Sequence, residues 1–483
     1  MSGEPAKSEA VSAGKPLRQA GRFEHFYKTR TQLKVLSWVV VAGKYQNDAS
    51  ATLDKPTLFA ALEEVVRNQP VLASRLEFTS AAPNAPPTWI RLPSVDLNRI
   101  VDFRDEDADQ LKGVLEDLYA VPPQCPDDVP LWRLLVLRDG TVVFAYEHTV
   151  GDGQSGMAFH IALLNALRRF QEPVLNHSGL ITDFSDEASL TPLLEDGVDV
   201  SVPFLSILRE VLNLIIPESW RKSWTAWTGK PTPESIVFGM NVQIAHYSPE
   251  DAQYLVKLSR EHNTTLVGTF HTLALIVLSR LISAEPDASK YKSIATSIPI
   301  SLRRFSGAPP TAFCNHLSAL REYHPLLAPQ YSSSTISADH FPWAVAARLT
   351  ETLKREAPRS GSSIGLLKLL GGKYEQYLRG MLGKKRAAGL ELSNLGPFPV
   401  NSLEKFADDA PPSSRWNVRE VLFAQADATL GAALLLNVAG SPTGGVGVTL
   451  TSNENAVDRA FAEKFFVDFG VGIQGLLASR DTK

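Results

Sequence analysis

The sequence predicts a mixed α/β fold arranged as two domains. The chain has 483 residues, which is too long for a single core of the usual size, so two domains of roughly 200 residues each are expected. Strand-like and helix-like segments are interleaved in both halves, and short hairpin turns join some of the strand-like segments. This combination indicates mixed sheets covered by helices rather than a purely parallel sheet.

Composition excludes several classes of protein. Hydrophobic residues make up 44% of the chain and charged residues 21%, as in globular proteins. The net charge of −4 and the pI near 6.2 show no excess of basic residues, which a nucleic-acid binder would need. The two cysteines, Cys125 and Cys314, lie far apart and outside any metal-ligand spacing. We therefore expect neither a disulfide scaffold nor a metal site, and we expect a cytoplasmic, reducing compartment.

The N-terminal half is expected to hold one domain over residues 21–174. Residues 1–20 are polar and small, without an apolar run, and are expected to be a disordered lead-in rather than a signal peptide. Alternation and turn signals then predict a strand over 34–45, a helix from Pro56 that stops before Pro70, a hairpin of 131–137 and 141–146 around Asp139-Gly140, and a buried helix over 153–170.

A crossover over residues 175–233 is expected to lead into a second domain over 234–483. Ser248-Pro249-Glu250-Asp251 is typical of a helix N-terminus, and two helical patterns follow it. The apolar stretch from Leu266 to Ile282 is short for a membrane span and carries a histidine and an arginine, so we expect a buried helix. The remaining predicted elements are strands over 293–301 and near 419–425, 430–439 and 444–451, and a final helix from Ala456.

One of the ten histidines, His148, stands in a run of residues that is suited to a catalytic site. The run His148-Thr-Val-Gly-Asp152-Gly153 joins a buried strand to a buried helix, so the side chains of its turn would be held in defined positions. A neutral imidazole can accept a proton from an alcohol or an amine. Asp152 could brace the turn, and Gly151 and Gly153 permit close backbone approach. The alternatives are a hydrogen-bonded core histidine and, less favoured because no third ligand lies nearby, a metal pair.

With its flanking segments, this motif resembles the acyltransferase superfamily that includes chloramphenicol acetyltransferase, plant BAHD enzymes and peptide-synthetase condensation domains. Along nearly its whole length the chain is similar to the fungal alcohol acetyltransferase family. The segments that carry the resemblance are Gly21-Arg-Phe-Glu24, Val65-Val66-Arg-Asn-Gln-Pro70, the His148 motif, Pro299-Ile-Ser-Leu-Arg303 and Ser393-Asn394-Leu395-Gly396-Pro-Phe398.

The resemblance implies two chloramphenicol-acetyltransferase-like α/β sandwich domains with a substrate tunnel between them. His148, Asp152 and Gly153 would form the catalytic motif. Asp152 would turn away from the substrate toward an arginine, for which Arg303 is the candidate; a surface arginine at a strand end is the alternative. Ser393, Asn394 and Asn315 would line the tunnel near the acyl group, although Ser393-Asn394 also suits an ordinary tight turn.

The sequence differs from two branches of this superfamily at a characteristic motif of each. The Asp-Phe-Gly-Trp-Gly motif of the BAHD enzymes is absent, which argues against the plant subgroup. Condensation domains often carry a second histidine directly before the catalytic one, and here Glu147 stands in that place. A condensation role with a carrier protein is therefore less favoured.

The expected activity is O-acyl transfer from acetyl-CoA, or another acyl-CoA, to a small or lipophilic alcohol, with no bound cofactor and no metal. N-acyl transfer to an amine and a non-catalytic binding module remain the alternatives. A P-loop enzyme is not favoured, since its glycine motif is absent, and neither is a serine hydrolase or a Rossmann enzyme. Trp220, Trp224 and Trp227 on one helical face, or the segment 364–386, could contact a lipid surface such as the endoplasmic reticulum or a lipid droplet. A monomer is expected.

Overall fold

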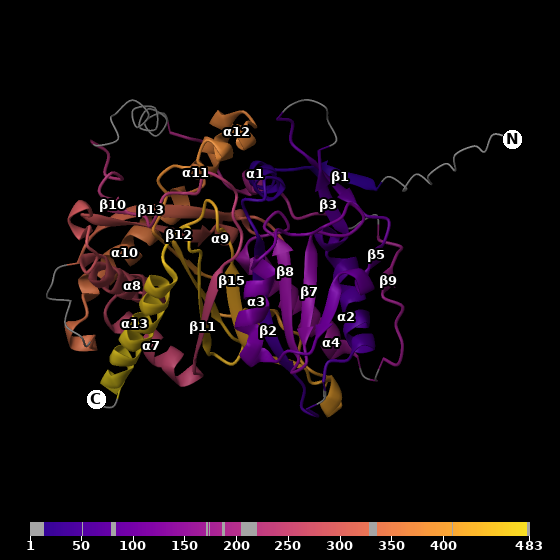
Figure 1. The fold of residues 1–483 in the computed structure, drawn as a ribbon. Helices are drawn as coiled ribbons and strands as arrows, with labels where there is room; N and C mark the ends of the chain where they lie inside the picture. Colours follow the sequence, from indigo (N-terminus) through magenta and orange to yellow (C-terminus); the bar gives the residue numbers. More distant parts are fainter. Residues whose placement is uncertain are drawn as a thin grey trace.

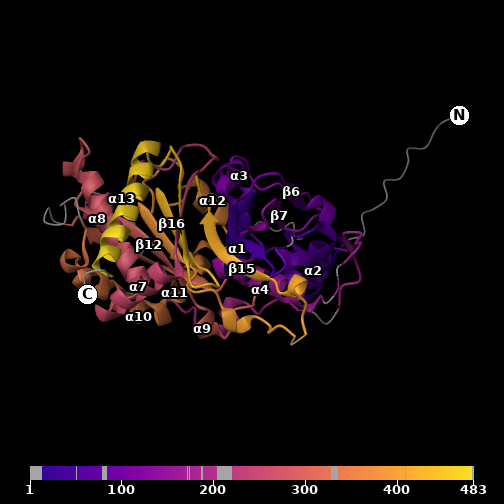
Figure 2. The ribbon, with the colours of Figure 1, turned by 90° about the horizontal axis from the view of Figure 1, so that it is seen from below.

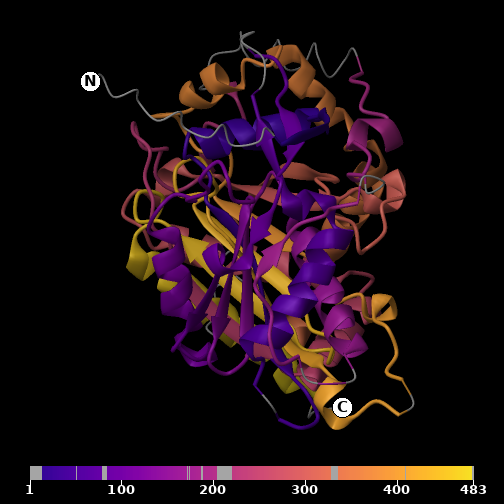
Figure 3. The ribbon, with the colours of Figure 1, turned by 90° about the vertical axis from the view of Figure 1, so that its right-hand side faces the viewer.

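The protein folds into two sheet-containing halves that face each other across a shared core. A computed structural model describes residues 14–50, 52–78, 84–170, 172, 174–185, 189–203, 220–327, 336–407 and 409–480. The N-terminal half lies on the right of Figure 1 and the C-terminal half on the left. The view in Figure 3 places the purple N-terminal strands in front of the orange and yellow C-terminal strands. The mixed α/β architecture predicted from the sequence is confirmed.

The N-terminal sheet has five strands, one of which comes from the far end of the chain. Its order is β15 (Asn417–Gln425), β2 (Trp38–Gln46), β8 (Thr141–Glu147), β7 (Trp132–Leu137) and β6 (Val101–Arg104), with only β6 parallel to its neighbour. Figure 2 shows orange β15 between the C-terminal strands and the indigo and purple N-terminal elements. The predicted division into residues 21–174 and 234–483 does not include this strand exchange.

Helices cover the outer face of the N-terminal sheet. This layer is formed by α2 (Lys55–Asn68) and α4 (Gly153–Arg169), whose apolar sides pack on Val39, Val41 and Phe144. α3 (Leu111–Tyr119) instead packs on the other face with Val40 and Ala145, and α1 (Arg22–Gln32) is the remaining helix of this half. Two small sheets flank it, β1 (Lys15–Gln19), β4 (Thr88–Arg91) and β3 (Ser74–Glu77), and β5 (Val95–Asp96) with β9 (Leu180–Ile181).

The C-terminal sheet has seven strands in the described residues. Its order is β10 (Ala226–Trp227), β12 (Ser293–Ser301), β14 (Leu390–Asn394), β16 (Leu434–Gly440), β17 (Val446–Ser452) and β11 (Asn241–Tyr247), and β13 (Leu317–Pro325) pairs with β12. The helices are α5 (Leu194–Gly197), α7 (Pro249–Glu261), α8 (Leu266–Ser283), α9 (Arg303–Ser306), α10 (Trp343–Glu356), α11 (Ser362–Gly365), α12 (Tyr374–Arg379) and α13 (Arg459–Leu477). α8 and α13 pack on the outer face of this sheet.

The two sheets are joined by an apolar layer and by hydrogen bonds along β15. Val40 and Ala145 of the N-terminal sheet share one core cluster with Val242 and Leu435 of the C-terminal sheet. Hydroxyl groups of β17 donate to carbonyl oxygens of β15, Thr449 to Phe423 at 2.6 Å and Thr451 to Gln425 at 2.7 Å. These bonds satisfy the open edge of β15, which would otherwise expose unpaired backbone groups.

Most predicted elements are confirmed with small shifts at their ends, and three expectations need correction. Order begins earlier than residue 21, because residues 15–19 form β1 and pair with β4; residues 1–13 lie outside the described part of the chain. The 131–146 hairpin has a three-residue loop of 138–140, with Gly140 at φ +84°, in place of a two-residue turn.

The third correction concerns the three tryptophans. They do not share a helical face, because Trp227 is buried in β10, whereas Trp220 and Trp224 are exposed. Contact with a lipid surface stays a prediction.

The apolar stretch after Thr265 forms the buried helix α8, as predicted. Within the described ranges α8 alone has the length and hydropathy of a membrane span, and 78% of its span lies buried inside the protein. His271 within it is fully buried.

Candidate active site

The His148 motif forms the turn between β8 and α4. β8 is buried along its whole length, and it ends at Glu147, the residue before His148. Asp152 caps α4, since its Oδ1 accepts a hydrogen bond from the Ser155 backbone N–H at 3.0 Å. The Tyr146 hydroxyl donates to the Asp152 carbonyl at 2.7 Å. The turn is therefore fixed at both ends by buried groups.

A buried ion pair ties this turn to the C-terminal half. Arg303 Nη2 donates to Asp152 Oδ1 at 2.7 Å and to Ser155 Oγ at 3.0 Å, and both charged side chains are more than nine-tenths buried. Arg303 Nη1 donates to the carbonyl oxygens of Pro309 and Ala312. Arg303 is thus not the surface arginine that the sequence left as an alternative, and the Asp152 carboxylate is turned toward it.

Asn315 holds the His148 imidazole in one orientation and one tautomer. The Asn315 amide nitrogen donates to the carbonyl oxygens of His148 at 2.9 Å and Thr149 at 3.1 Å, so the amide oxygen faces the ring. This oxygen lies 3.1 Å from His148 Nδ1. Because it can only accept, Nδ1 carries the proton and Nε2 keeps its lone pair.

His148 differs from a hydrogen-bonded core histidine. His160 is a histidine of that core kind in this protein. Both ring nitrogens of His160 are engaged, by the Tyr45 hydroxyl and by the Val41 carbonyl. Among the described residues, Nε2 of His148 has no such partner, and its side chain keeps intermediate exposure. A nitrogen with a free lone pair in a partly open position can receive a proton.

Tyr27 of α1 covers one face of the imidazole. The two rings are stacked, with centroids 3.8 Å apart and planes 7° from parallel. Burial lowers the pKa of His148 to about 4; Arg30 also lowers it, whereas the backbone carbonyl of His148, Asp152 and Asn315 act in the opposite direction. Arg30 itself forms an ion pair with Asp427, which limits its effect. The ring is consequently neutral at physiological pH.

The second predicted motif meets the first across the junction of the two halves. Gln154 Nε2 donates to the Leu395 carbonyl at 3.2 Å. A Cβ atom at Gly153 would lie 2.5 Å from Leu395 Cδ2, so a larger residue there would displace the Leu395 side chain. Asn394 Oδ1 accepts from the Gly396 N–H at 2.7 Å, and Gly396 has φ +81°. Ser393 and Asn394 therefore end β14, a tight turn follows at Gly396, and the contact with the His148 motif comes from Leu395.

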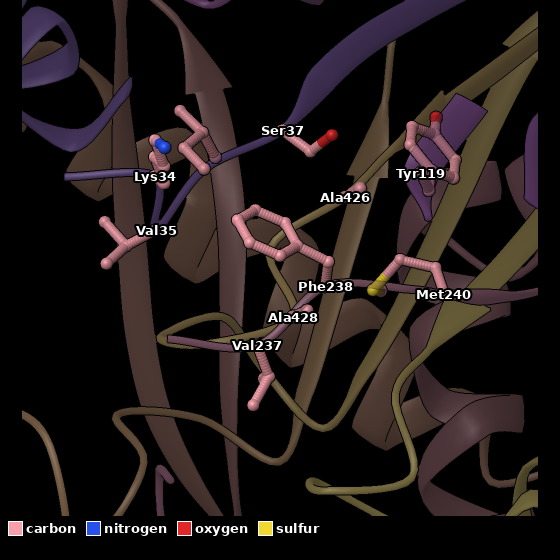
Figure 4. A pocket seen from close by; sticks show the side chains of 10 residues that line it. Lys34, Val35, Ser37, Tyr119, Val237, Phe238, Met240, Ala426 and Ala428 are labelled. Carbon is pink, nitrogen blue, oxygen red and sulfur yellow. The ribbon is translucent and has the colours of Figure 1, made fainter. Parts of the chain in front are cut away.

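Two small cavities lie near the motif. One is lined by Phe313, Cys314 and Asn315 together with residues 191–195, and so reaches the residue that holds His148. The other lies where β2 begins, and its lining includes Ser37, Tyr119, Phe238 and Met240 (Figure 4). Ala426 and Ala428, which stand on either side of Asp427 in the sequence, also line this second cavity. A continuous tunnel between the halves stays a prediction.

The structure thus places most of the predicted site residues close to the His148 turn. Asn315 uses its amide to hold His148, and its expected place beside the acyl group stays a prediction. Tyr27 was missed, because the stripe of Phe23, Phe26 and Tyr27 in α1 indicates a buried side but not the residue on which it packs. Ser155 was also missed, and its position three residues after Asp152 is the available signal for a helix cap.

Solved structures with a similar fold define the class of protein. A trichothecene 15-O-acetyltransferase, TRI3, from Fusarium sporotrichioides matches with a TM-score of 0.70 and 14% identity, covering 98% of each chain. The condensation domain of the monacolin K polyketide synthase MokA matches with a TM-score of 0.55 and 11% identity, covering 96% of this chain and 98% of that one. The protein has the chloramphenicol-acetyltransferase-like fold of acyltransferases.

The sequence comparisons give the family. The model of the alcohol acetyltransferase family matches residues 19–469. A probable alcohol acetyltransferase, crmB, from Aspergillus fumigatus is 26% identical over 436 residues, which cover 84% of this chain and 87% of the relative. The chain belongs to the alcohol acetyltransferase family, and it is an acyltransferase by family and fold.

Replacing Arg303 by methionine is expected to destabilise the protein. The change leaves the Asp152 carboxylate buried without its cation, which costs about 3–5 kcal/mol of unfolding free energy. Urea unfolding of wild type and R303M measures this cost. Arg304, the exposed neighbour, supplies the matched control R304M, and equal stability of the two variants would contradict a role for the buried pair.

Replacing Asn315 by aspartate is expected to raise the pKa of His148 from about 4 toward its ordinary value of 6.5. A carboxylate beside Nδ1 stabilises the protonated imidazole. NMR titration of the His148 ring measures the shift. N315L removes the hydrogen bond without adding a charge and should not raise the pKa; an unchanged pKa in N315D would show that Asn315 does not contact the ring.

Proposed function

We propose that the protein transfers an acetyl group from acetyl-CoA to an alcohol, with neutral His148 as the general base. The observation that carries this proposal is the hydrogen bond of Asn315 to His148 Nδ1, which leaves the Nε2 lone pair free in a buried, partly open position. Family membership supports the acyl transfer and the name of the family supports the alcohol acceptor. The choice of acetyl-CoA rests on the same family likeness.

The reaction needs no covalent enzyme intermediate. His148 Nε2 takes the proton of the acceptor hydroxyl while the oxygen attacks the thioester carbonyl carbon. The tetrahedral intermediate collapses, the carbon–sulfur bond breaks, and the imidazolium returns the proton to the departing thiolate. The products are the acetyl ester and CoA with a free thiol. The Ser393 hydroxyl, on the second motif, is a candidate donor to the oxyanion.

Asp152 is assigned a positioning role rather than a chemical one. Its Oδ1 already accepts hydrogen bonds from Arg303 and from the Ser155 N–H, and it lies behind the turn rather than on the His148 ring. The arrangement is therefore not a Ser-His-Asp relay. The carboxylate fixes the turn from which His148 projects.

Acceptor-dependent release of CoA should depend on His148. General base catalysis contributes about 10²–10⁴-fold, so H148A is expected to lose at least that factor in kcat with a panel of alcohols and amines. Detection of free thiol from acetyl-CoA measures the rate. H340A, which alters an exposed histidine, is the control.

Equal rates in H148A and wild type would exclude His148 as the base. A response to amines but not to alcohols would assign N-acyl transfer instead. No release with any acceptor, by a folded wild type, would favour a binding module.

The rate of acyl transfer is expected to persist to lower pH than in an enzyme whose histidine base has the ordinary pKa of 6.5. Because burial lowers the pKa of His148 to about 4, its neutral form predominates above that pH and is lost as pH falls through it. The value of kcat/KM should stay level from pH 7 to about 5 and then decline. A decline centred near 6.5 would show that the free enzyme does not hold His148 as described.

A further inference from the structure

One end of the molecule exposes apolar and basic side chains together. Trp220 and Trp224 are 80% and 53% exposed, while the other six tryptophans of the chain are at least partly buried. Leu369 and Tyr377 are also exposed, and both belong to the run 366–379 that ends in α12. A single exposed apolar residue needs no explanation, whereas a group of them marks a contact surface.

Hydrogen bonds hold the two segments that carry these side chains next to each other. Lys385 Nζ donates to the Trp224 carbonyl oxygen at 2.8 Å, and the Thr232 backbone N–H donates to the Lys384 carbonyl oxygen at 2.8 Å. Figure 1 places α11 and α12 at the top of the molecule, above β10 and β13. We name the exposed side chains of residues 220–224 and 366–385 the α12 surface.

The α12 surface is basic, although the whole chain has a net charge of −4. Its two segments hold seven lysines and arginines and one acid, Glu375, which pairs with Arg379. Four exposed lysines form no ion pair with an acid of the described chain: Lys222, Lys368, Lys373 and Lys384. The rest of the chain is therefore acidic overall, and an anionic surface would attract this end of the molecule in preference to any other.

The mixture of tryptophan, leucine and lysine suits a lipid surface better than a protein partner. Indole rings lie at the level of lipid headgroups, leucine lies at the boundary with the acyl chains, and lysine binds anionic headgroups. The centre of a protein interface is depleted of lysine. Here the lysines alternate with the apolar residues, since Lys222 stands between the two tryptophans and Lys368 precedes Leu369.

One helix separates the α12 surface from the His148 ring. Tyr374 of α12 packs on α1 through His25 and Phe26, with ring centroids 4.7 and 5.6 Å apart. The next residue of α1, Tyr27, stacks on the His148 imidazole. A layer that contacts the α12 surface would therefore lie close to the candidate active site.

We propose that the α12 surface docks the protein on an anionic lipid surface. The indole rings of Trp220 and Trp224 enter the headgroup layer, and the four lysines bind its negative charges. Docking then brings the His148 turn near lipophilic acceptors dissolved in the lipid. This last step rests on the proposed function, whereas the docking itself does not.

Flotation of the full chain with vesicles, in the absence of acetyl-CoA, tests the docking. One set of vesicles is phosphatidylcholine alone, and the other contains about 30% phosphatidylserine, which makes its surface negative. Wild type should bind the anionic vesicles at least about tenfold more tightly. Salt should weaken this binding because it screens the lysines. Tryptophan fluorescence should shift to shorter wavelength as the two exposed rings leave water.

Two double variants separate the apolar contact from the charge. W220S/W224S should lower the affinity for vesicles by about tenfold or more and abolish the fluorescence shift. K368Q/K373Q removes two charges and should lower the affinity for anionic vesicles by about 10–30-fold, with little change for phosphatidylcholine alone. All four residues are exposed, so both variants should fold as wild type does.

Matched controls carry the same kinds of change on other surfaces. V467S/V471S alters two exposed valines of α13, and K257Q/K464Q alters two exposed lysines of α7 and α13. Neither control should change vesicle binding. Equal binding by wild type, W220S/W224S and K368Q/K373Q would overturn the role of the α12 surface. A folded wild type that binds neither kind of vesicle would overturn the docking, and its retention on immobilised polyglutamate would then assign the surface to an acidic protein.

Docking and acyl transfer can fail separately. Transfer from acetyl-CoA to dodecan-1-ol held in anionic vesicles should fall in W220S/W224S, while transfer to a water-soluble alcohol should not. Vesicle binding that depends on the α12 surface, without transfer to any acceptor, would overturn the proposed function and leave the docking intact. Transfer that requires His148, without any vesicle binding, would overturn the docking and leave the proposed function intact.

Discussion

The ion pair between Arg303 and Asp152 is the interaction on which the geometry of the site depends. Two buried charges are costly, and their attraction offsets the cost only when the remaining donors are also satisfied. Here the two Nη groups of Arg303 bond Asp152, Ser155 and two backbone carbonyls, and its buried Nε alone has no partner among the described residues. The pair thus joins a loop of the C-terminal half to the turn that carries His148.

The same loop then sets the tautomer of His148, the proposed base. Cys314 accepts a hydrogen bond from the Asp152 N–H, and the next residue, Asn315, bonds the His148 ring and its carbonyl. The loop that carries Arg303 and Asn315 therefore fixes both the position of the turn and the tautomer of the imidazole. Stacking on Tyr27 and burial keep the ring neutral, so the chemistry needs no carboxylate behind the histidine.

Continuous segments of this protein could be predicted from the sequence, and contacts between distant segments could not. The strand 293–301 and the helix after Asp152 follow from local patterns and form as expected. β15 reads as one strand of a C-terminal series, but it pairs with β2, some 375 residues earlier, because the open edge of β2 lies beside it in space. Nothing local specifies that choice.

The same division between continuous segments and contacts between distant segments applies to the site. His148, Asp152 and the glycines stand in one run, and their turn could be predicted. Arg303 was reached through family likeness rather than from its own surroundings. The stacking of Tyr27, the role of Asn315 and the burial of Trp227 depend on which surfaces the folded halves bring together. Periodicity within α1 carries no such information, since the stripe of Phe23, Phe26 and Tyr27 marks a buried side but not its partner.

Strand exchange also limits how the site can open. β15 is hydrogen-bonded to β2 within the N-terminal sheet and receives hydroxyl bonds from β17 of the C-terminal sheet. Separating the halves would break both sets, as well as the apolar cluster between the sheets. Opening the site by a hinge motion would therefore cost these contacts. The proposed base, His148, comes from the N-terminal half, while Arg303 and Asn315, which fix its turn and its ring, come from the C-terminal half.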